Sequence, residues 1–387
     1  MILPPEFVSR TRDITGDQWY EFESALNDES PVSIRFNRKK MRDINCDYDK
    51  VPWAEDAYYL TKRPVFTLDP LFHAGGYYVQ EASSMYLEHF VRQYIDSPVK
   101  ALDICAAPGG KATHLSSILP KGSLLVANEV IRSRVPVLVE NIVKWGNPET
   151  IVTNSDPSEI GKLSGFFDFI LCDLPCSGEG MFRKDPDSIK EWSVENVRLC
   201  AKRQRRIVAD VFPALKSGGI IIYCTCTYNR EENEENIEWI CNELGAELLE
   251  PPKRFIIHNT KGEGFFIAGM RKKGSFWEKN SLSLDSLKIV YNAAEMLANW
   301  NKHPAPPHEL AMSTALPENV FPHWELDTST ALKYLHREAL YDVPPEIPKG
   351  FVLLTYNGLP LGFVKNIGVR ANNFYPKEWR IRMNIPS

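Results

Sequence analysis

Short apolar runs alternate with longer amphipathic runs between residues 99 and 273, and this alternation is the clearest pattern in the chain. Short apolar runs predict buried strands, whereas apolar residues three or four positions apart predict helices. We expect strands at residues 99–104, 123–128, 150–153, 167–172 and 220–224. We expect helices at residues 111–119, 131–145, 195–216 and 231–244, the second of which begins or kinks near Pro136. This order is typical of an α/β fold with a doubly wound parallel sheet.

The segments on either side of this alternation have weaker patterns. Residues 1–95 are rich in aromatic side chains and predict an irregular leader. Residues 274–286 turn polar and residues 301–323 are rich in Pro and His, which predicts a boundary followed by an exposed connection. We therefore expect three domains, at residues 1–95, 96–273 and 280–387.

The last part of the chain predicts a hairpin. Residues 351–356 and 359–364 are apolar, and Asn357-Gly358 between them is a strong signal for a tight two-residue turn. We expect this C-terminal domain to be small, and mixed or β-rich.

Composition places the chain among soluble globular proteins. Its 387 residues are 43% hydrophobic and 25% charged, which leaves room for two or three domains. No apolar run approaches the roughly 20 residues needed to cross a bilayer, and residues 1–5 lack the features of a signal peptide. We expect a cytoplasmic protein without membrane contact. Its eight cysteines are too sparse for a disulfide scaffold, so free thiols are expected in that reducing compartment.

Basic residues gather in three places, although the net charge is −5. The clusters are Arg35, Arg38, Lys39, Lys40 and Arg42; Arg198, Lys202, Arg205 and Arg206; and Lys365, Arg370, Lys377, Arg380 and Arg382. The third cluster is interleaved with the aromatic residues Phe363, Phe374, Tyr375 and Trp379, which adds stacking surfaces to phosphate contacts. Solvated surfaces explain each cluster taken alone, but together the three favour binding of RNA or DNA.

A glycine turn follows the first predicted strand, with the sequence Cys105-Ala106-Ala107-Pro108-Gly109-Gly110-Lys111, and a helix comes next. Such a turn lets the backbone approach a ligand and points the amides of the helix N-terminus at it. The turn does not supply the first two glycines of the dinucleotide fingerprint, which makes an NAD enzyme the weaker option.

Acidic residues follow the next three strands. Glu129 closes the second strand, where an acid accepts hydrogen bonds from ribose hydroxyls. Asp156 follows the third strand, in position to meet an adenine edge, and Asp173 follows the fourth. A helix cap or turn acid is the alternative interpretation of Asp156 and Glu129. A nucleoside site without a pyrophosphate requirement suits S-adenosylmethionine better than NAD.

Two cysteines, Cys176 and Cys226, each come after an apolar strand. Carboxyl ends of parallel strands line the ligand crevice, so both thiols are expected in one site, which indicates covalent chemistry. A zinc site that also uses Cys172 and Cys224 is the alternative, but the Cys-x-Cys and Cys-x₃-Cys spacings are unusual for zinc and we expect no metal. The glutamates at 231–238 are expected to form a solvated first helical turn.

Longer motifs around these residues resemble a known family. The turn at 105–111, the run Asp173-Leu174-Pro175-Cys176-Ser177-Gly178-Glu179-Gly180, and Thr225-Cys226-Thr227 with Glu231-Glu232-Asn233-Glu234 resemble motifs of the Sun-type RNA cytosine-5 methyltransferases. Residues 78–85 and Arg183-Lys184-Asp185-Pro186 resemble the bacterial RsmF branch, which modifies small-subunit ribosomal RNA. The resemblance is weaker beyond residue 280, where residues 350–382 resemble a PUA-like region.

The resemblance implies a Rossmann-like methyltransferase sheet with an N-terminal RNA-binding extension and a small C-terminal α+β or PUA-like domain. It implies that Cys226 is the nucleophile and that Cys176 assists product release, although DNA cytosine methyltransferases place the nucleophile in a context like Pro175-Cys176. Asp173 would hydrogen-bond the N3/N4 edge of the base, and Lys111 would contribute electrostatically. The cofactor would be S-adenosylmethionine, bound by Cys105, Ala106, Ala107, Pro108, Gly109, Gly110, Lys111, Glu129, Arg134, Asp156 and Asp173.

Two thiols suit this reaction. C5 of cytosine is a poor nucleophile until a thiolate adds to C6, and the thiolate must later be expelled. No His or Lys flanks Cys226, so the sulfonium charge and a helix N-terminus are expected to favour its thiolate form.

We therefore expect methyl transfer to C5 of a cytosine in 16S ribosomal RNA. The expected partner is that RNA or the 30S subunit, and the expected state is a monomer. A transfer-RNA cytosine-5 methyltransferase and a catalytically silent assembly factor are the alternatives; a silent factor has little use for both Cys176 and Cys226.

Overall fold

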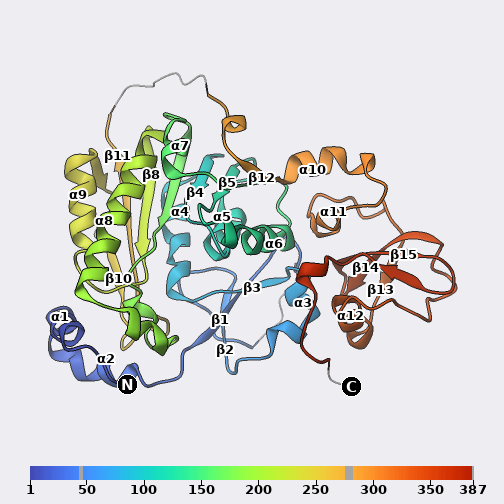
Figure 1. Cartoon of the computed structure of the whole chain (residues 1–387), viewed down its shortest axis with the longest axis horizontal. Coiled ribbons are helices and arrows are strands. Elements are labelled where there is room, and N and C mark those ends of the chain that lie inside the picture. The colour runs from blue at the N-terminus through green and yellow to red at the C-terminus, as the bar shows by residue number, and fades with distance from the viewer. Residues whose placement is uncertain (43–46, 275–281, 386–387) are drawn as a thin grey trace.

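A nine-stranded sheet forms the centre of the computed structural model, which describes residues 1–42, 47–274 and 282–385 (Figure 1). The strand order is β10-β11-β8-β7-β4-β5-β6-β12, and β9 pairs with β11 outside this path. The strands from β8 to β6 are parallel, and the strands beyond them are antiparallel to their neighbours. The nine strands are β4 Lys100–Asp103, β5 Leu124–Asn128, β6 Thr150–Thr153, β7 Phe167–Asp173, β8 Leu215–Thr225, β9 Ala246–Leu248, β10 Lys253–Phe255, β11 Phe265–Lys272 and β12 Ile289–Asn292.

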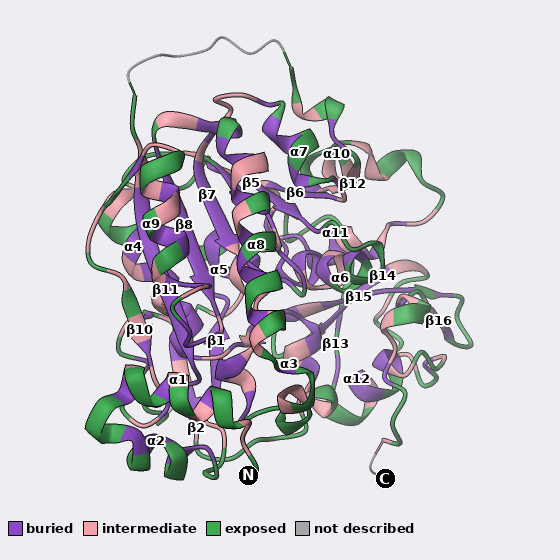
Figure 2. Cartoon of the chain, turned by 60° about the vertical axis from the view of Figure 1, so that its left-hand side comes forward, coloured by how far each residue is buried: buried purple, intermediate pink, exposed green. Residues whose placement is uncertain are grey.

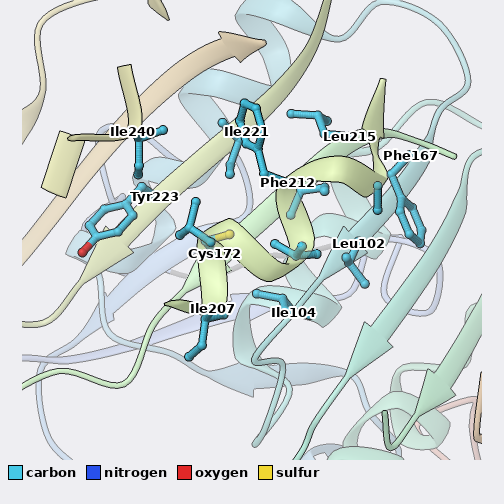
Figure 3. Close-up of a cluster of buried hydrophobic side chains, with 14 of the residues drawn as sticks. Leu102, Ile104, Phe167, Cys172, Ile207, Phe212, Leu215, Ile221, Tyr223 and Ile240 are labelled. Atoms are coloured by element: carbon cyan, nitrogen blue, oxygen red, sulfur yellow. The ribbon is translucent and has the colours of Figure 1, made fainter. Parts of the chain in front are cut away.

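Helices cover both faces of this sheet, as expected for a doubly wound fold. The helices are α4 Leu87–Tyr94, α5 Gly110–Ile118, α6 Val135–Trp145, α7 Pro157–Gly161, α8 Val194–Val211 and α9 Glu234–Glu243. The face under α7, α8 and α9 buries a cluster that includes Leu102, Phe167 and Ile221 (Figure 3). The opposite face buries a second cluster under α4, α5 and α6. The predicted α/β core is confirmed.

The end of one predicted helix and the start of the strand after it differ most from the sequence prediction. The predicted helix at 195–216 ends at Val211, because Pro213 lies in a 3-10 turn and cannot donate the backbone hydrogen bond that a helix requires. The strand after it begins at Leu215 rather than 220. The helix α6 begins at Val135 with Pro136 in its first turn, which confirms that the helix starts near this proline.

The N-terminal region is regular, so the expectation of an irregular leader was wrong. It contains α1 Pro5–Thr15, α2 Trp19–Ala25, α3 Pro70–His73 and a three-stranded sheet in the order β2-β1-β3, formed by β1 Val32–Phe36, β2 Ala57–Leu60 and β3 Tyr77–Val79. Its aromatic residues form buried clusters: Phe7 packs on Phe182 and Trp192 of the central domain. Pairing between β1 and β3 joins segments far apart in the chain, which local periodicity does not reveal.

The chain contributes one more strand to the central sheet after residue 280. Strand β12 pairs with β6 before α10 Ala293–Asn299 begins. The short helix α11 His308–Met312 is buried and contacts β15 and α6, which corrects the expectation of an exposed connection at 301–323. The hydrophobic effect favours the packing of this helix, since its apolar residues Leu310, Ala311 and Met312 are all buried.

The C-terminal domain is a four-stranded sheet with one covering helix. It comprises β13 His323–Glu325, β14 Gly350–Tyr356, β15 Leu359–Asn366 and β16 Ala371–Asn373, with α12 Thr328–Leu335. The predicted hairpin is confirmed: Asn357 and Gly358 have φ angles of 48° and 74° between β14 and β15. This domain packs on α3 of the N-terminal region. In the described residues no helix is long and apolar enough to cross a membrane.

Two basic residues of the first cluster and two aromatic rings of the third are structural. Arg35 is buried, donates to Gln80 and Thr113, and lies over the Trp145 ring. Lys40 donates to two backbone carbonyl oxygens, and burial lowers its pKa to about 7. In the C-terminal cluster the rings of Phe363 and Tyr375 are buried, so they offer no stacking surface, which corrects that part of the interpretation.

Candidate active site

The carboxyl ends of the parallel strands bring the predicted site residues to one edge of the sheet. Asp103 ends β4, Asp173 ends β7, and Cys226 follows β8 directly. The pairing register places Asp103 beside Leu171 and Asp173 beside Cys224. Residues separated by more than one hundred positions in the chain therefore share one crevice edge.

The glycine turn begins helix α5 at this edge. Gly109 has a φ of 120°, which non-glycine residues rarely adopt, and a Cβ there would lie 3.1 Å from Cβ of Asn141. The side chain of Arg134 donates to the Ala107 carbonyl oxygen at 2.6 Å, and Asn141 donates to the Pro108 oxygen at 2.8 Å. The turn is thus fixed from α6 and the segment before it, while its backbone stays close to the crevice.

The acids at the strand ends differ in their surroundings. Glu129 is 2% exposed; its Oε1 accepts from the backbone of Ile131, and its Oε2 has no hydrogen-bond partner in the described part of the chain. Arg134 lies 3.5 Å from that oxygen. Asp156 is exposed and accepts from the backbone amide of Ser158, so it caps α7 as the alternative interpretation stated.

Asp103 is a site residue that the sequence reasoning did not select. It is fully buried, and neither carboxylate oxygen has a hydrogen-bond partner among the described residues. Burial, together with the charge of Asp173, raises its pKa well above the usual range. The signal for it was its position: like the selected acids, it closes a strand of the parallel sheet.

Lys111 and Asp173 form an ion pair beside Asp103. The Nζ of Lys111 donates to Oδ2 of Asp173 at 2.9 Å. Burial alone would lower the pKa of Lys111, but the negative charges of Asp173 and of the thiolate forms of Cys224 and Cys226 raise it. Lys111 therefore stays charged and supplies positive potential near the two strand ends.

The two predicted cysteines meet. The Sγ atoms of Cys176 and Cys226 lie 3.0 Å apart, and both side chains are free thiols at intermediate exposure. The hydrogen bond with Cys226 is the largest cause of a raised pKa at Cys176, followed by burial. Cys172 is fully buried in the core, as expected of a small apolar group, and Cys224 lies 3.6 Å from Oδ1 of Asp173.

A buried polar network surrounds the two cysteines, and the sequence reasoning missed it. Glu232 is fully buried and precedes α9, so the expectation that all glutamates at 231–238 are solvated was wrong. Glu179, in the motif after Cys176, is 2% exposed. The sequence carried a signal for this network. Many residues that can form hydrogen bonds follow each cysteine, and a turn exposed to solvent does not require them.

Comparisons with known families match three consecutive parts of the chain. Residues 3–82 match the N-terminal domain of 16S rRNA methyltransferase RsmF, residues 96–271 match 16S rRNA methyltransferase RsmB/F, and residues 321–381 match the methyltransferase RsmF PUA domain.

Relatives of known name cover nearly the whole chain. Ribosomal RNA small subunit methyltransferase F of Salmonella heidelberg is 30% identical over 97% of this chain and 96% of that protein. The protein of the same name from Serratia proteamaculans is 28% identical over 98% of this chain and 96% of that protein.

Solved structures agree with the fold. A methyltransferase homologue from Pyrococcus horikoshii has a TM-score of 0.60 at 28% identity and covers 69% of this chain and 94% of that chain. NSun6 from the same organism, solved with SFG, has a TM-score of 0.60 at 18% identity, over 70% of this chain and 99% of that chain.

Proposed function

Since the chain belongs to the RsmF family of 16S rRNA methyltransferases, we propose that it methylates C5 of a cytosine in that RNA and that Cys226 is the nucleophile. The single observation that carries this assignment is the contact of the Cys176 and Cys226 sulfurs at 3.0 Å, at the carboxyl edge of the sheet. One thiol opens the catalytic cycle and its neighbour lies within reach to help close it.

The reaction proceeds in three steps. The thiolate of Cys226 forms a bond to C6 of the cytosine, which makes C5 electron-rich. S-adenosylmethionine, when bound, would supply the methyl group to C5 as an electrophile and would leave as S-adenosylhomocysteine. The C5 proton leaves to a base, the C5–C6 double bond re-forms, and the bond between C6 and Cys226 breaks. Cys176, whose pKa is raised chiefly by the hydrogen bond with Cys226, remains a neutral thiol beside the leaving sulfur.

Lys111 and Asp173 supply the charges of the site. Lys111 lies close enough to Cys226 for the two charges to interact, so it supplies positive potential beside the sulfur to which we assign the attack. We assign to Asp173, which accepts a hydrogen bond from Lys111 at 2.9 Å, a second hydrogen bond from the exocyclic amine of the base.

The glycine turn and the strand-end acids suit S-adenosylmethionine. Glu129 and Asp103 carry buried carboxylate oxygens without a hydrogen-bond partner in the described residues, although Arg134 lies 3.5 Å from the Glu129 oxygen, and such atoms cost free energy unless a ligand satisfies them. Ribose hydroxyls and an ammonium group are the donors that this cofactor offers. We assign its binding to Cys105, Ala106, Ala107, Pro108, Gly109, Gly110, Lys111, Glu129, Arg134, Asp156 and Asp173, and we add Asp103.

Three parts of the chain share the work in this proposal. Residues 96–273 carry the chemistry, while residues 1–95 and 280–387 hold the RNA around the target nucleotide. The target must be unpaired or flipped, because a stacked base hides C6. The RNA is presented as naked 16S rRNA or as the 30S subunit, in the cytoplasm where subunits assemble, and the enzyme acts as a monomer.

Methyl transfer from labelled S-adenosylmethionine tests the proposal, with 16S rRNA, isolated small subunits and transfer RNA as substrates. We expect wild type to form 5-methylcytosine in the ribosomal RNA and Cys226→Ala to form none. Cys176→Ala should accumulate a covalent protein–RNA adduct, because expulsion of Cys226 is slowed. The control is Cys241→Ala, a half-buried thiol on α9.

Three outcomes would contradict parts of the proposal. Full activity of Cys226→Ala would reject the nucleophile assignment. Transfer to transfer RNA alone would reject the ribosomal substrate, and the absence of transfer by wild type to any of these RNAs would favour the silent assembly factor.

A further inference from the structure

The loop after Cys176 is bound to the loop after Cys226 by the side chain of Glu179. Its Oε2 accepts hydrogen bonds from the Thr227 hydroxyl at 2.7 Å and from the backbone amides of Tyr228 and Asn229 at 2.8 Å each. Its Oε1 accepts from the indole of Trp192 at 2.9 Å. One carboxylate oxygen therefore fixes three consecutive residues that follow the second cysteine.

Glu232 makes the reciprocal connection, from the loop after Cys226 back to the loop after Cys176. Its Oε2 accepts from the backbone amide of Ser177 at 3.0 Å and from Gln204 at 2.7 Å. Its Oε1 accepts from the Asn229 side chain at 2.8 Å. Gln204 also donates to the carbonyl oxygen of Pro175, the residue just before the first cysteine.

Direct contacts between the two loops complete the arrangement. The hydroxyls of Ser177 and Thr227 lie 2.9 Å apart, and the amide of Gly180 donates to the carbonyl oxygen of Cys226 at 2.9 Å. Both cysteines are thus followed at once by residues that are bonded to the opposite loop.

Burial of the two carboxylates costs free energy. Glu179 and Glu232 are 2% and 0% exposed, and in the part of the chain that the structure describes neither has a cation within 4 Å. Burial raises the pKa of Glu232, and the charge of Glu179 adds to this increase. Buried carboxylates without a cation persist only where several donors satisfy them, and here every donor to Glu232 belongs to, or also contacts, a cysteine loop.

We infer that Glu179 and Glu232 are positioning residues that lock the two cysteine loops together and thereby set the contact between the Cys176 and Cys226 sulfurs. This inference rests on the proposed function of the two thiols, and it assigns a role to two buried residues that the proposed function does not use.

Disulfide formation in the absence of RNA and cofactor tests the lock directly. Glutathione disulfide takes two electrons from the two thiols, two protons are released to the reduced glutathione, and the Cys176–Cys226 bond forms; peptide mapping by mass spectrometry follows it. We expect the disulfide to form rapidly in wild type and at least tenfold more slowly in Glu179→Gln and Glu232→Gln. The N–H groups of the glutamine amide cannot accept the hydrogen bonds that the carboxylate accepts, so the two loops are no longer held together.

Turnover provides the second readout. A displacement of about 1 Å at a reacting group costs on the order of 10²-fold in rate, so kcat should fall by about that factor while KM for S-adenosylmethionine stays unchanged. Glu179→Asp and Glu232→Asp keep the charge and should recover part of the rate, and they replace the amide variants if those fail to fold.

Matched controls separate the lock from general destabilisation. Glu88→Gln changes a buried carboxylate on α4 that binds His114 and Arg92 and contacts neither cysteine loop. Trp192→Phe removes one donor to Glu179 but leaves the bonds between the loops. Both should oxidise Cys176 and Cys226 at the wild-type rate.

Two results would overturn the inference: wild-type oxidation rates in both amide variants, or failure of wild type to form the disulfide. Because this assay uses no RNA, failure of the proposed methyl transfer leaves its result intact. Loss of RNA methylation in wild type together with a slowed disulfide in the variants would reject the function and retain the lock.

Discussion

Cys176 offers a test at the scale of a single residue. Its pKa is raised first by the hydrogen bond with Cys226 and then by burial. Cys226→Ala removes the first cause, so the pKa of Cys176 should fall and its thiolate fraction at pH 8 should rise. We expect iodoacetamide to alkylate Cys176 several-fold faster in Cys226→Ala than in wild type, as measured by mass spectrometry.

In Cys226→Ala the smaller side chain also makes Cys176 more accessible to the reagent, and this effect must be separated from the change in the Cys176 pKa. Cys226→Ser keeps a hydroxyl of similar size beside Cys176, and the half-buried Cys241 serves as an internal reference. An alkylation rate of Cys176 that is equal in wild type and both variants would contradict the pKa argument.

Substitution of Asp103 is expected to have opposite effects on the stability of the ligand-free protein and on cofactor binding. Its pKa is raised in the folded protein by burial and by Asp173, so the unfolded chain releases its proton at lower pH than the folded chain does. Between these two pKa values the folded protein binds more protons, and stability falls as pH rises. Asp103→Asn removes this penalty and should raise the Tm of the ligand-free protein above pH 5.

Asp103→Asn should also weaken cofactor binding, because the carboxylate that accepts hydrogen bonds from the cofactor is lost. We expect S-adenosylmethionine to stabilise wild type in thermal denaturation and to stabilise Asp103→Asn much less. The control is Asp187→Asn, which changes an exposed carboxylate outside the cofactor-binding set and should leave the pH dependence of Tm unchanged. A lower Tm of Asp103→Asn at pH 7 would contradict the argument.

At the scale of elements, α8 carries a surface that suits RNA. Its outward face, visible in Figure 2, exposes Arg198, Lys202 and Arg206 at intervals of one helical turn. Four residues of helix rise about 6 Å, which is close to the spacing of phosphates along an extended strand. Arg198 lies near Glu231 at one end of this stripe, and Arg206 lies near Asp156 at the other.

This stripe predicts salt-dependent RNA binding. Lys202→Glu should weaken binding to 16S rRNA fragments and reduce the slope of log Kd against log salt by about 1, because one phosphate contact is lost. Lys190→Glu alters an exposed lysine outside α8 and is the control. Fluorescence anisotropy measures both; an unchanged slope for Lys202→Glu would show that the stripe is only a solvated face.

Local periodicity predicted the elements whose burial is regular. The five parallel strands and the helices α5, α6, α8 and α9 were predicted, whereas the short helix α7 and the antiparallel strands β9, β10 and β11 were missed. The Asn357-Gly358 hairpin was found because its turn has a distinctive local signature. The N-terminal strands were missed because β1 is defined by partners more than twenty residues away. Glu232 was misjudged for a similar reason: its carboxylate is satisfied by Ser177 in the loop after Cys176 and by Gln204 of α8, both distant in the sequence.

At the scale of the whole molecule, the site depends on how the three parts pack. Motif positions located Cys176, Cys226, Lys111 and Asp173 correctly at one sheet edge, because the carboxyl ends of parallel strands must coincide. The packing of the C-terminal domain on α3 was not predictable, since it joins surfaces that are each ordinary in sequence.

The junction between these parts contains buried histidines, and this predicts acid sensitivity. Burial, with the charges of Lys144 and Lys40, lowers the pKa of His308 to about 3. Both its ring nitrogens lack a partner among the described residues, and its ring packs edge-on against Tyr375 and Trp379. Since unfolded histidine has a pKa near 6.5, the stability that this neutral side chain supports is present above pH 6.5 and is lost as pH falls towards 3.

His308→Phe removes the titrating group while keeping a planar ring in the same space. At pH 5 the protonation of unfolded histidine costs wild type about 2 kcal/mol of stability from this position, and the variant should lack that loss. The difference in Tm between pH 7.5 and pH 5 should therefore be smaller in His308→Phe, whereas His303→Phe, at an exposed position, should match wild type. An equal pH dependence in both variants would mean that another group, such as His73 beside Tyr375 with its pKa also lowered to about 3, dominates the acid response of the junction.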